Sequence, residues 1–214
     1  MTATVTWWWI RHAPVAGAEG RLNGRRDVPC DVSDTATIAA LAAVLPAGAV
    51  GVTSTLIRAR QTYGALCEAG APLPPPLAEP DFAEQSFGLW EGKTWAEIAR
   101  DDPAEHARFW LRPMQSAPPG GESFVDQMSR TAAAIGRHTG SCQARDIVCT
   151  AHGGSIRAAV AMALGIGPEA AMALVVDNLS LTRLTHVRQG LLRGHGGAWL
   201  VQGVNLRWPL PADA

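Results

Sequence analysis

The chain has 214 residues, of which 47% are hydrophobic and 17% are charged, and its formal net charge at pH 7 is -1. This length and composition fit one globular domain with one sizeable core, so we expect a single domain over 1–214. The near-neutral charge gives no reason to expect nucleic acid or an anionic membrane as a partner. A site for an anion would therefore need a local concentration of positive charge.

The cysteines, the N-terminal residues and the apolar runs indicate in which cellular compartment the protein is expected. The four cysteines are scattered and form neither a C-x-x-C pair nor a metal-ligand spacing: Cys30, Cys67, Cys142 and Cys149. The N-terminal residues lack the basic residues and the small-residue cleavage site of a signal peptide. No apolar run approaches the length of a membrane span. We therefore expect a cytoplasmic protein with reduced thiols and no membrane partner.

The first predicted element is a strand over 5–10, whose bulky apolar residues are typical of a parallel strand buried on both faces. It is followed by Arg11 and His12, and Pro14 prevents the strand from continuing. Ligands bind at the carboxyl edge of open α/β sheets, so these two side chains are candidates for a site. The alternative is an ordinary strand end whose Arg and His face water.

The next elements alternate between loop, helix and strand. Residues 15–31 have no periodicity and predict a loop that arches over the sheet edge. The predicted elements after it are a helix over 35–45 capped by Ser33 or Asp34, a buried strand over 49–53 that leads into Ser54 to Arg58, and a helix that ends near Ala69 before the prolines at 72–76. Residues 77–125 are the least regular segment, with short helices around 94–100 and 103–111. We expect this segment to be a lid-like excursion over the sheet edge.

The second half of the chain continues the alternation. Its predicted elements are a helix over 123–139, a strand over 147–151 followed by His152-Gly153-Gly154, a helix over 155–164, a short helix from about 168, and strands at about 180–187 and 198–204. Alternating strands and helices predict an α/β fold, a three-layer α/β/α sandwich with a mostly parallel central sheet.

Three strand-to-helix junctions carry polar groups, and all three should reach the same carboxyl edge. They are Arg11-His12, Ser54 to Arg58, and His152-Gly153-Gly154. Guanidinium groups bind phosphate oxygens in bidentate fashion, and the amides at a helix start form an anion site. The convergence predicts a site for a phosphate or sulfate ester.

The sequence disfavours two other kinds of site, one for a metal ion and one for a dinucleotide. His12 and His152 could ligate a metal ion, but two neighbouring arginines would repel a cation, and neither an H-x-x-x-H pattern nor paired carboxylates accompany them. No G-x-G-x-x-G follows the first strand, which disfavours a dinucleotide cofactor. We therefore expect neither a metal nor a cofactor.

Taken together, the motifs resemble the histidine phosphatase superfamily, which has the phosphoglycerate mutase-like fold. The resemblance spans most of the chain. It rests on Arg11-His12, Ser54-x-Leu56-x-Arg58-Ala59-x-Gln61-Thr62, Glu84-x-x-Phe87-Gly88-x-Trp90-Glu91-Gly92 and His152-Gly153-Gly154, with smaller matches at Gly24-x-x-Asp27-Val28-Pro29 and Gly120-Gly121-Glu122-Ser123.

The resemblance implies roles for individual residues. His12 would be the nucleophile that takes the phosphoryl group, and Glu84 would be the general acid and then the general base. Phosphate oxygens would be held by Arg11, Arg58 and His152, and the substrate would be bound by Asn23, Gly24, Ser54 and Gly153. Glu79 and Glu91 are rival carboxylates, but the family spacing to Phe87-Gly88 favours Glu84. Three positions depart from the family pattern: Ala13, Val15 and Ala18.

The implied activity is that of a metal-independent phosphomonoesterase that hydrolyses a small soluble phosphate ester through a phosphohistidine intermediate. The α-ribazole phosphatase branch is the most similar in appearance, which makes α-ribazole phosphate one candidate substrate. Uncharged Gln85 and Ser86 after Glu84 favour hydrolysis over a bisphosphoglycerate-dependent phosphoglycerate mutase. A phosphate-ligand-binding module without turnover is the third alternative. The oligomeric state stays open, and a homodimer is one alternative.

Overall fold

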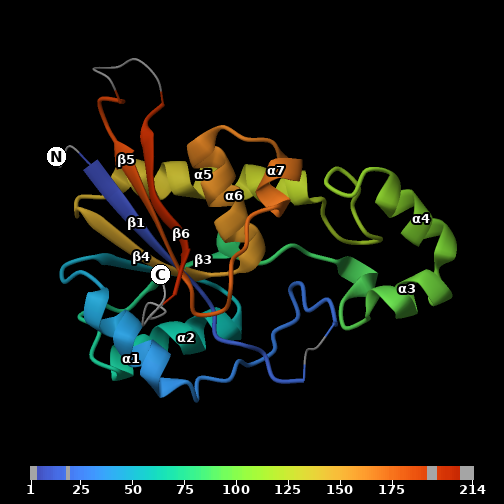
Figure 1. Ribbon diagram of the computed structural model, residues 1–214, viewed down its shortest axis with the longest axis horizontal. Coiled ribbons are helices and arrows are strands. Elements are labelled where there is room, and N and C mark those ends of the chain that lie inside the picture. The colour runs from blue at the N-terminus through green and yellow to red at the C-terminus, as the bar shows by residue number, and fades with distance from the viewer. Residues whose placement is uncertain (1–3, 18–19, 192–196, 208–214) are drawn as a thin grey trace, which may run out of the picture.

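A six-stranded sheet forms the centre of the computed structural model, which describes residues 4–17, 20–191 and 197–207 (Figure 1). The strand order is β3-β2-β4-β1-β5-β6. The strands are β1 (Thr4–Arg11), β2 (Val50–Ser54), β3 (Leu77–Glu79), β4 (Asp146–Ala151), β5 (Leu181–Val187) and β6 (Trp199–Leu206). β3, β2, β4 and β1 pair in parallel, while β5 and β6 are antiparallel. The prediction of a mostly parallel sheet is confirmed.

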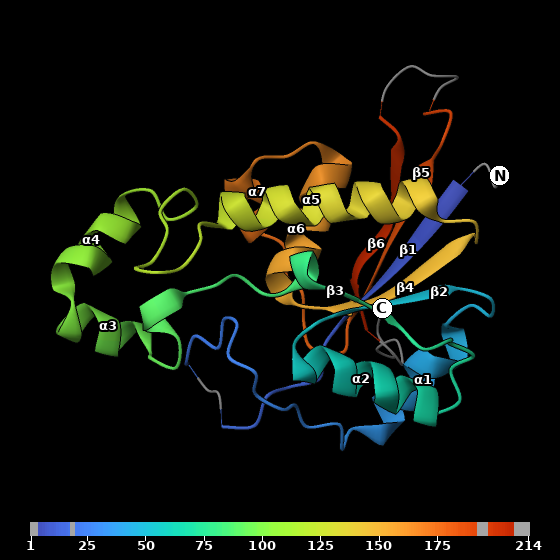
Figure 2. The same cartoon turned by 180° about the vertical axis from the view of Figure 1, so that it is seen from behind.

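Helices cover both faces of the sheet, so the three predicted layers are also confirmed. The helices α1 (Thr35–Val44) and α2 (Ile57–Glu68) lie on one face, and α5 (Phe124–Ser141), α6 (Gly153–Leu164) and α7 (Pro168–Met172) lie on the other (Figures 1 and 2). The boundaries agree closely with the sequence, and α1 begins after Asp34, whose carboxylate accepts a hydrogen bond from Thr37 N at 3.1 Å.

The central strand β1 contributes to the core on both faces. Val5, Trp7 and Trp9 pack toward α5 and α6, and the two indole rings stack with centroids 4.9 Å apart. Ile10 packs on the opposite face with α1 and α2. Trp8 is only half-buried, which differs from the expected complete burial, and its indole Nε1 donates to Asp146 Oδ1 at 2.8 Å.

The segment expected to be irregular starts with a strand that the sequence did not reveal. Residues 77–79 form β3, which pairs with β2 at the sheet edge, so the excursion proper begins at Pro80. It contains two short 3-10 helices, η1 (Pro80–Phe82) and η2 (Gly88–Trp90), and the helices α3 (Trp95–Asp101) and α4 (Pro103–Leu111). In Figure 1, α3 and α4 lie to one side of the sheet. They have their own apolar cluster, centred on Trp90, Ile98 and Phe109.

The four cysteines carry free thiols, as expected: Cys30, Cys67, Cys142 and Cys149. Burial raises the pKa of each of these thiols. Within the described ranges, no helix combines the length and the apolar character that crossing a bilayer requires.

Candidate active site

The three polar junctions meet at one edge of the sheet, as predicted. β4 lies between β1 and β2 in parallel register, so the residues that follow all three strands emerge side by side. A cavity of about 470 Å³ opens at this edge. Its lining includes the predicted Arg11, His12, Asn23, Gly24, Arg58 and Glu84, together with Pro14, Val15, Arg21, Leu22, Gln85, Phe87, Phe124, Gln127, Gly154, Arg157, Met172 and Asn178.

His12 is a neutral base with a fixed tautomer. Its Nδ1 lies 2.6 Å from the carbonyl oxygen of Ala13, and a carbonyl only accepts, so Nδ1 carries the proton and Nε2 has the lone pair. Burial, together with the nearby Arg58 and Arg11, lowers the pKa of His12 to about 3 against the opposing effect of the Ala13 bond. The imidazole is 6% exposed at the cavity. A neutral imidazole with a free ring nitrogen is chemically able to act as a nucleophile at neutral pH.

The backbone around His12 is held from two sides. Asn178 Nδ2 donates to the His12 carbonyl oxygen at 2.7 Å, and Ala13 N donates to Thr62 Oγ1 at 2.9 Å. Of the positions that depart from the family pattern, Ala13 is fully buried and Val15 lines the cavity. Ala18 lies outside the described residues.

His152 lies behind His12, fully buried, with the two ring centroids 5.1 Å apart. Its Nε2 pairs with Ser54 Oγ at 2.8 Å, and its Nδ1 makes no hydrogen bond within the described part of the chain. Burial, with the nearby His12 and Arg58, holds the pKa of His152 well below its ordinary value.

Ser54 does not lie where a substrate-binding residue was expected. It is the last residue of β2, beside β4, and its fully buried hydroxyl meets the imidazole of His152 instead of the cavity. Gly153 is likewise buried, and Gly154, one residue later, lines the cavity. A Cβ on Gly154 would lie 2.3 Å from Glu84 Oε1, so this close approach requires glycine.

The two predicted arginines are both anchored by carbonyl groups. Arg58 donates to the carbonyl oxygens of Gly24 at 2.7 Å and Arg26 at 2.8 Å, and so holds the predicted substrate loop against α2. Arg11 Nη1 donates to Val176 O at 2.5 Å, and Arg11 Nε is buried without a hydrogen bond to any described residue. Gly24 has a φ of +49°, and a Cβ there would lie 2.3 Å from Glu91 Oε1.

Glu84 is the carboxylate that lies in the cavity. Gln127 Nε2 donates to its Oε1 at 3.0 Å, Gln85 N at 3.0 Å and Gly154 N at 3.2 Å. Burial raises the pKa of Glu84, but these hydrogen bonds and the charge of Arg11 lower it, and the resulting pKa lies below the ordinary value. Glu84 is therefore ionised in the free protein at neutral pH.

The two rival carboxylates have other contacts. Glu79 Oε2 pairs with His138 Nε2 at 2.9 Å, and Glu79 does not line the cavity. Glu91 Oε1 accepts from Arg25 N at 2.8 Å and Phe87 N at 3.1 Å, so it supports the loop backbone. Family spacing thus selected the carboxylate that the fold brings to the cavity.

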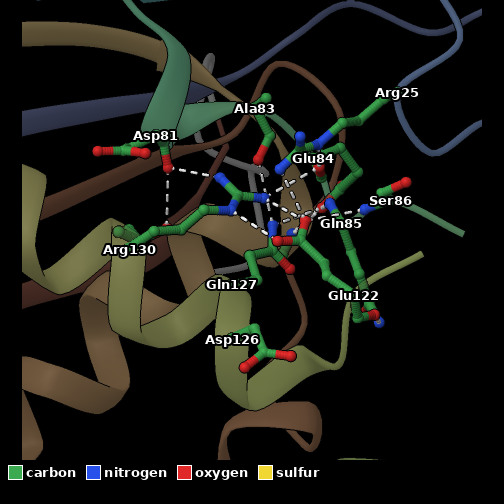
Figure 3. Close-up of polar contacts among 12 residues, drawn as sticks. Arg25, Asp81, Ala83, Glu84, Gln85, Ser86, Glu122, Asp126, Gln127 and Arg130 are labelled. Carbon is green, nitrogen blue, oxygen red and sulfur yellow. Dashed lines mark hydrogen bonds and ion pairs between the residues drawn. The ribbon is translucent and has the colours of Figure 1, made fainter. Parts of the chain in front are cut away.

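An ion pair holds the main chain on either side of Glu84 (Figure 3). Arg130 Nη2 donates to Glu84 O at 3.1 Å and to Glu122 Oε1 at 2.7 Å, and Arg130 Nη1 donates to Asp81 O at 2.6 Å. The same Glu122 oxygen accepts from Ser86 N at 2.9 Å. The segment that carries the candidate acid is therefore tied to α5.

Sequence reasoning missed several cavity residues on α5, α6, α7 and the segment after α7. They are Phe124, Gln127, Arg157, Met172 and Asn178. A signal existed for Arg157, because it lies four residues after Gly153 on α6 and so shares its helical face. Gln127 and Asn178 follow no motif, and tertiary packing alone directs them to the cavity.

The donor set is suited to an anion. Guanidinium groups, imidazole rings and a helix-start amide line or adjoin the cavity, with Glu84 as the acidic group among the residues that line it. Over the ranges that the structure describes, no three His, Cys, Asp or Glu side chains are grouped as metal ligands would be.

Known proteins resemble this chain in sequence over most of its length. Residues 7–193 match the family model of the histidine phosphatase superfamily, branch 1. A 2,3-bisphosphoglycerate-dependent phosphoglycerate mutase 2 of Gloeobacter violaceus is 30% identical over 166 residues, which are 75% of this chain and 76% of that protein. A bifunctional protein of Mycobacterium tuberculosis is 34% identical over 106 residues, 50% of this chain. The aligned part covers 29% of the mycobacterial protein, so this chain spans under a third of its length.

Solved structures agree with that match. The mycobacterial glucosyl-3-phosphoglycerate phosphatase superposes with a TM-score of 0.76 at 27% identity, covering 95% of this chain and 99% of that one. The alpha-ribazole phosphatase from Shigella flexneri gives a TM-score of 0.79 at 18% identity, covering 94% and 96%, which shows a shared fold. The sequence match and the shared fold lead to one conclusion: this chain belongs to the histidine phosphatase superfamily, branch 1.

Proposed function

We propose that the protein is a phosphomonoesterase that hydrolyses a small phosphate ester without a metal ion, through a phosphohistidine formed on His12. The observation that carries the proposal is the hydrogen bond between His12 Nδ1 and Ala13 O, which leaves Nε2 unprotonated in a residue that lines the cavity. A neutral imidazole can attack phosphorus only through such a free nitrogen.

The same edge of the sheet supplies the positive charge that a phosphate requires. Arg11 and Arg58 line the cavity, and the dipole of α6 points its positive end there. Arg11 Nε and His152 Nδ1 can each donate to a phosphate oxygen, the latter when Nε2 accepts from the Ser54 hydroxyl. We assign the equatorial oxygens to these donors, in place of the divalent cations that other phosphoryl-transfer enzymes use.

Two displacements account for the hydrolysis. His12 Nε2 attacks phosphorus, the bond to the ester oxygen breaks, and Glu84 gives its proton to the departing oxygen. Glu84 then takes a proton from water as the water oxygen attacks the phosphohistidine, and the electron pair of the P–N bond returns to Nε2. Because the free carboxylate is ionised, the dianionic substrate must raise the pKa of Glu84 for the first step.

The segment between Pro80 and Ser123 is proposed to act as a lid of the same single domain. Gln85 and Phe87 from this segment line the cavity, and the cluster around Trp90 and Phe109 makes the segment a packed unit. A lid excludes water and completes the binding site around a small ester.

The substrate is proposed at the level of class, with two candidates named by relatives. Structural likeness supports α-ribazole phosphate, and the 27% identity to a glucosyl-3-phosphoglycerate phosphatase supports that ester. A second candidate function is a bisphosphoglycerate-dependent mutase, which the 30% identity to the Gloeobacter protein favours. A mutase is distinguished by interconversion of phosphoglycerates that depends on added 2,3-bisphosphoglycerate.

The test is release of phosphate from p-nitrophenyl phosphate in the presence of a chelator. Wild type should turn over, His12→Ala should lose activity by roughly 10³-fold or more, and His106→Ala, at a residue that does not line the cavity, should retain it. Turnover by His12→Ala at the wild-type rate would remove the nucleophile from the proposal. Ligand binding without turnover on a broad panel of esters would instead indicate the phosphate-binding module.

A further inference from the structure

Arg157 stands out among the cavity residues because its charge has no protein partner. Its Nε donates to Leu174 O at 2.9 Å, which fixes the guanidinium plane at the cavity wall. Among the residues that the structure describes, nothing accepts a hydrogen bond from Nη1 or Nη2, and no carboxylate pairs with Arg157.

Each of the other arginines at the cavity has at least one terminal nitrogen that donates to a protein acceptor, and in Arg11 it is Nη1, which donates to Val176 O. Both terminal nitrogens of Arg58 donate to backbone carbonyls. Arg21 pairs with Glu97 at 2.9 Å and also donates to Gly92 O. Arg157 therefore differs from the other three, because neither of its terminal nitrogens has an acceptor among the described residues.

The position of Arg157 is close to the proposed phosphoryl site. The Cβ position of Gly153 lies 3.3 Å from Arg157 Nη1 and 3.7 Å from Arg11 Nε, so two guanidiniums meet over the start of α6. Like charges held this close in a half-buried site repel each other unless an anion lies between or beside them. One phosphate already has Arg11 and Arg58 at the cavity, so another free guanidinium indicates additional negative charge on the ligand.

We propose that Arg157 is a specificity-determining residue that binds a second anionic group of the substrate, a carboxylate or a second phosphate, a few bonds from the transferred phosphoryl group. This inference rests on the proposed function of the same cavity. The cavity lining supports a short substrate, since Phe124 and Met172, which line the same cavity, offer no polar side-chain group that could bind a long hydroxylated chain. A planar guanidinium suits either anion because it donates two parallel hydrogen bonds.

The test compares esters that differ in one group. 3-Phosphoglycerate and glycerol 3-phosphate differ by a carboxylate against a hydroxymethyl group, and glycerol 1,3-bisphosphate supplies the second phosphate. We expect wild type to prefer one of the two doubly anionic esters over glycerol 3-phosphate by at least about tenfold in kcat/KM. Whichever of the two is preferred identifies the second anion.

The matched variants are Arg157→Met, Arg157→Lys and, as a control on the exposed surface away from the cavity, Arg145→Met. Arg157→Met should lower kcat/KM for the preferred ester by about 10- to 100-fold and leave glycerol 3-phosphate within about threefold. The kcat/KM of Arg157→Lys for the preferred ester should lie between those of wild type and Arg157→Met, because lysine keeps the charge but cannot donate two parallel hydrogen bonds from one planar group. Equal losses on all esters, or no loss on any, would overturn the proposal.

A binding measurement separates this inference from the proposed function. Calorimetric titration of His12→Ala with the same three esters reports affinity without turnover. A preference for a doubly anionic ester that disappears in the His12→Ala, Arg157→Met double variant supports the anion site even if wild type hydrolyses none of them. Equal affinities for all three esters contradict the site, even if wild type is an active phosphatase.

Discussion

His12 Nδ1 lies 2.6 Å from the carbonyl oxygen of Ala13, the residue that follows it. Because the carbonyl can only accept, this contact fixes the proton on Nδ1 and leaves Nε2 basic. Burial, which lowers the pKa of His12 to about 3, keeps the ring neutral over the ordinary pH range. The protein thus holds a neutral imidazole among guanidinium groups before any ligand binds.

Replacing Glu84 by Gln should separate substrates by their leaving groups. Glu84→Gln removes the proton donor, so alkyl phosphates should lose roughly 10²- to 10⁴-fold in kcat/KM, which reports the first displacement and not the shared hydrolysis of the phosphohistidine. The kcat/KM for p-nitrophenyl phosphate should fall much less, because its leaving group needs little protonation in the first displacement. Steady-state kinetics on the two kinds of ester checks this. Equal losses would argue against Glu84 as the acid.

Replacing Gln127 should shift the titration of Glu84. Gln127 Nε2 donates to Glu84 Oε1 at 3.0 Å, so Gln127→Leu removes a bond that favours the ionised carboxylate. We expect the pKa of Glu84 to rise, as followed by the side-chain ¹³C resonance in glutamate-labelled protein. The signal is assigned by its loss in Glu84→Gln. Ser129→Ala, on the exposed side of the same helix, should leave the titration unchanged, and an unmoved titration in Gln127→Leu would exclude this role.

The ion pair between Arg130 and Glu122 should affect both stability and turnover. The two side chains are 15% and 17% exposed, and together they hold the main chain at Asp81, Glu84 and Ser86. Arg130→Met should lower the free energy of unfolding by about 2–4 kcal/mol and reduce kcat. The matched control is Arg137→Met on the same helix, whose side chain is 56% exposed, so that its loss should lower the free energy of unfolding far less than the loss of Arg130. Similar urea midpoints for the two variants would show that the pair does not hold the loop.

The buried histidine should make the fold sensitive to acid. Unfolded His12 takes up a proton near its ordinary pKa of 6.5, whereas folded His12 does so only near pH 3. Stability is therefore lost as the pH falls below about 6.5, by about 2 kcal/mol at pH 5 for this group. His12→Asn lacks the effect, so its urea midpoint should fall less than that of wild type between pH 7 and pH 5. Equal decreases in the two proteins would mean that His12 is charged in the folded state.

Much of the fold was predictable because the buried strands are apolar and each junction follows one of them. Val5 to Ile10 identified β1, and the same logic located β2 and β4, which are neighbours in the sheet. β3 was missed because it has three residues, two of them exposed, directly after a run of prolines. Its assignment depends on pairing with β2, which no local pattern reveals.

The site was predictable where a residue follows a strand and less so where tertiary packing decides. His12, Arg58 and Glu84 line the cavity as the motifs indicated. The direction of the Ser54 side chain could not be predicted. A shift of one residue along the strand decides whether its hydroxyl points to the cavity or, as observed, to His152. Arg157 lies on a helix whose rotation about its own axis is fixed by core packing, so its direction follows only from the fold.

The most direct test of the account is chemical trapping of the phosphorylated protein. Wild type is mixed for a few milliseconds with a ³²P-labelled phosphate ester and quenched in alkali, which preserves phosphohistidine. The account predicts label on a single peptide, at Nε2 of His12, and no label in His12→Asn or in wild type quenched in acid and heated. Full turnover with the label absent from His12, or retained turnover in His12→Asn, would contradict it.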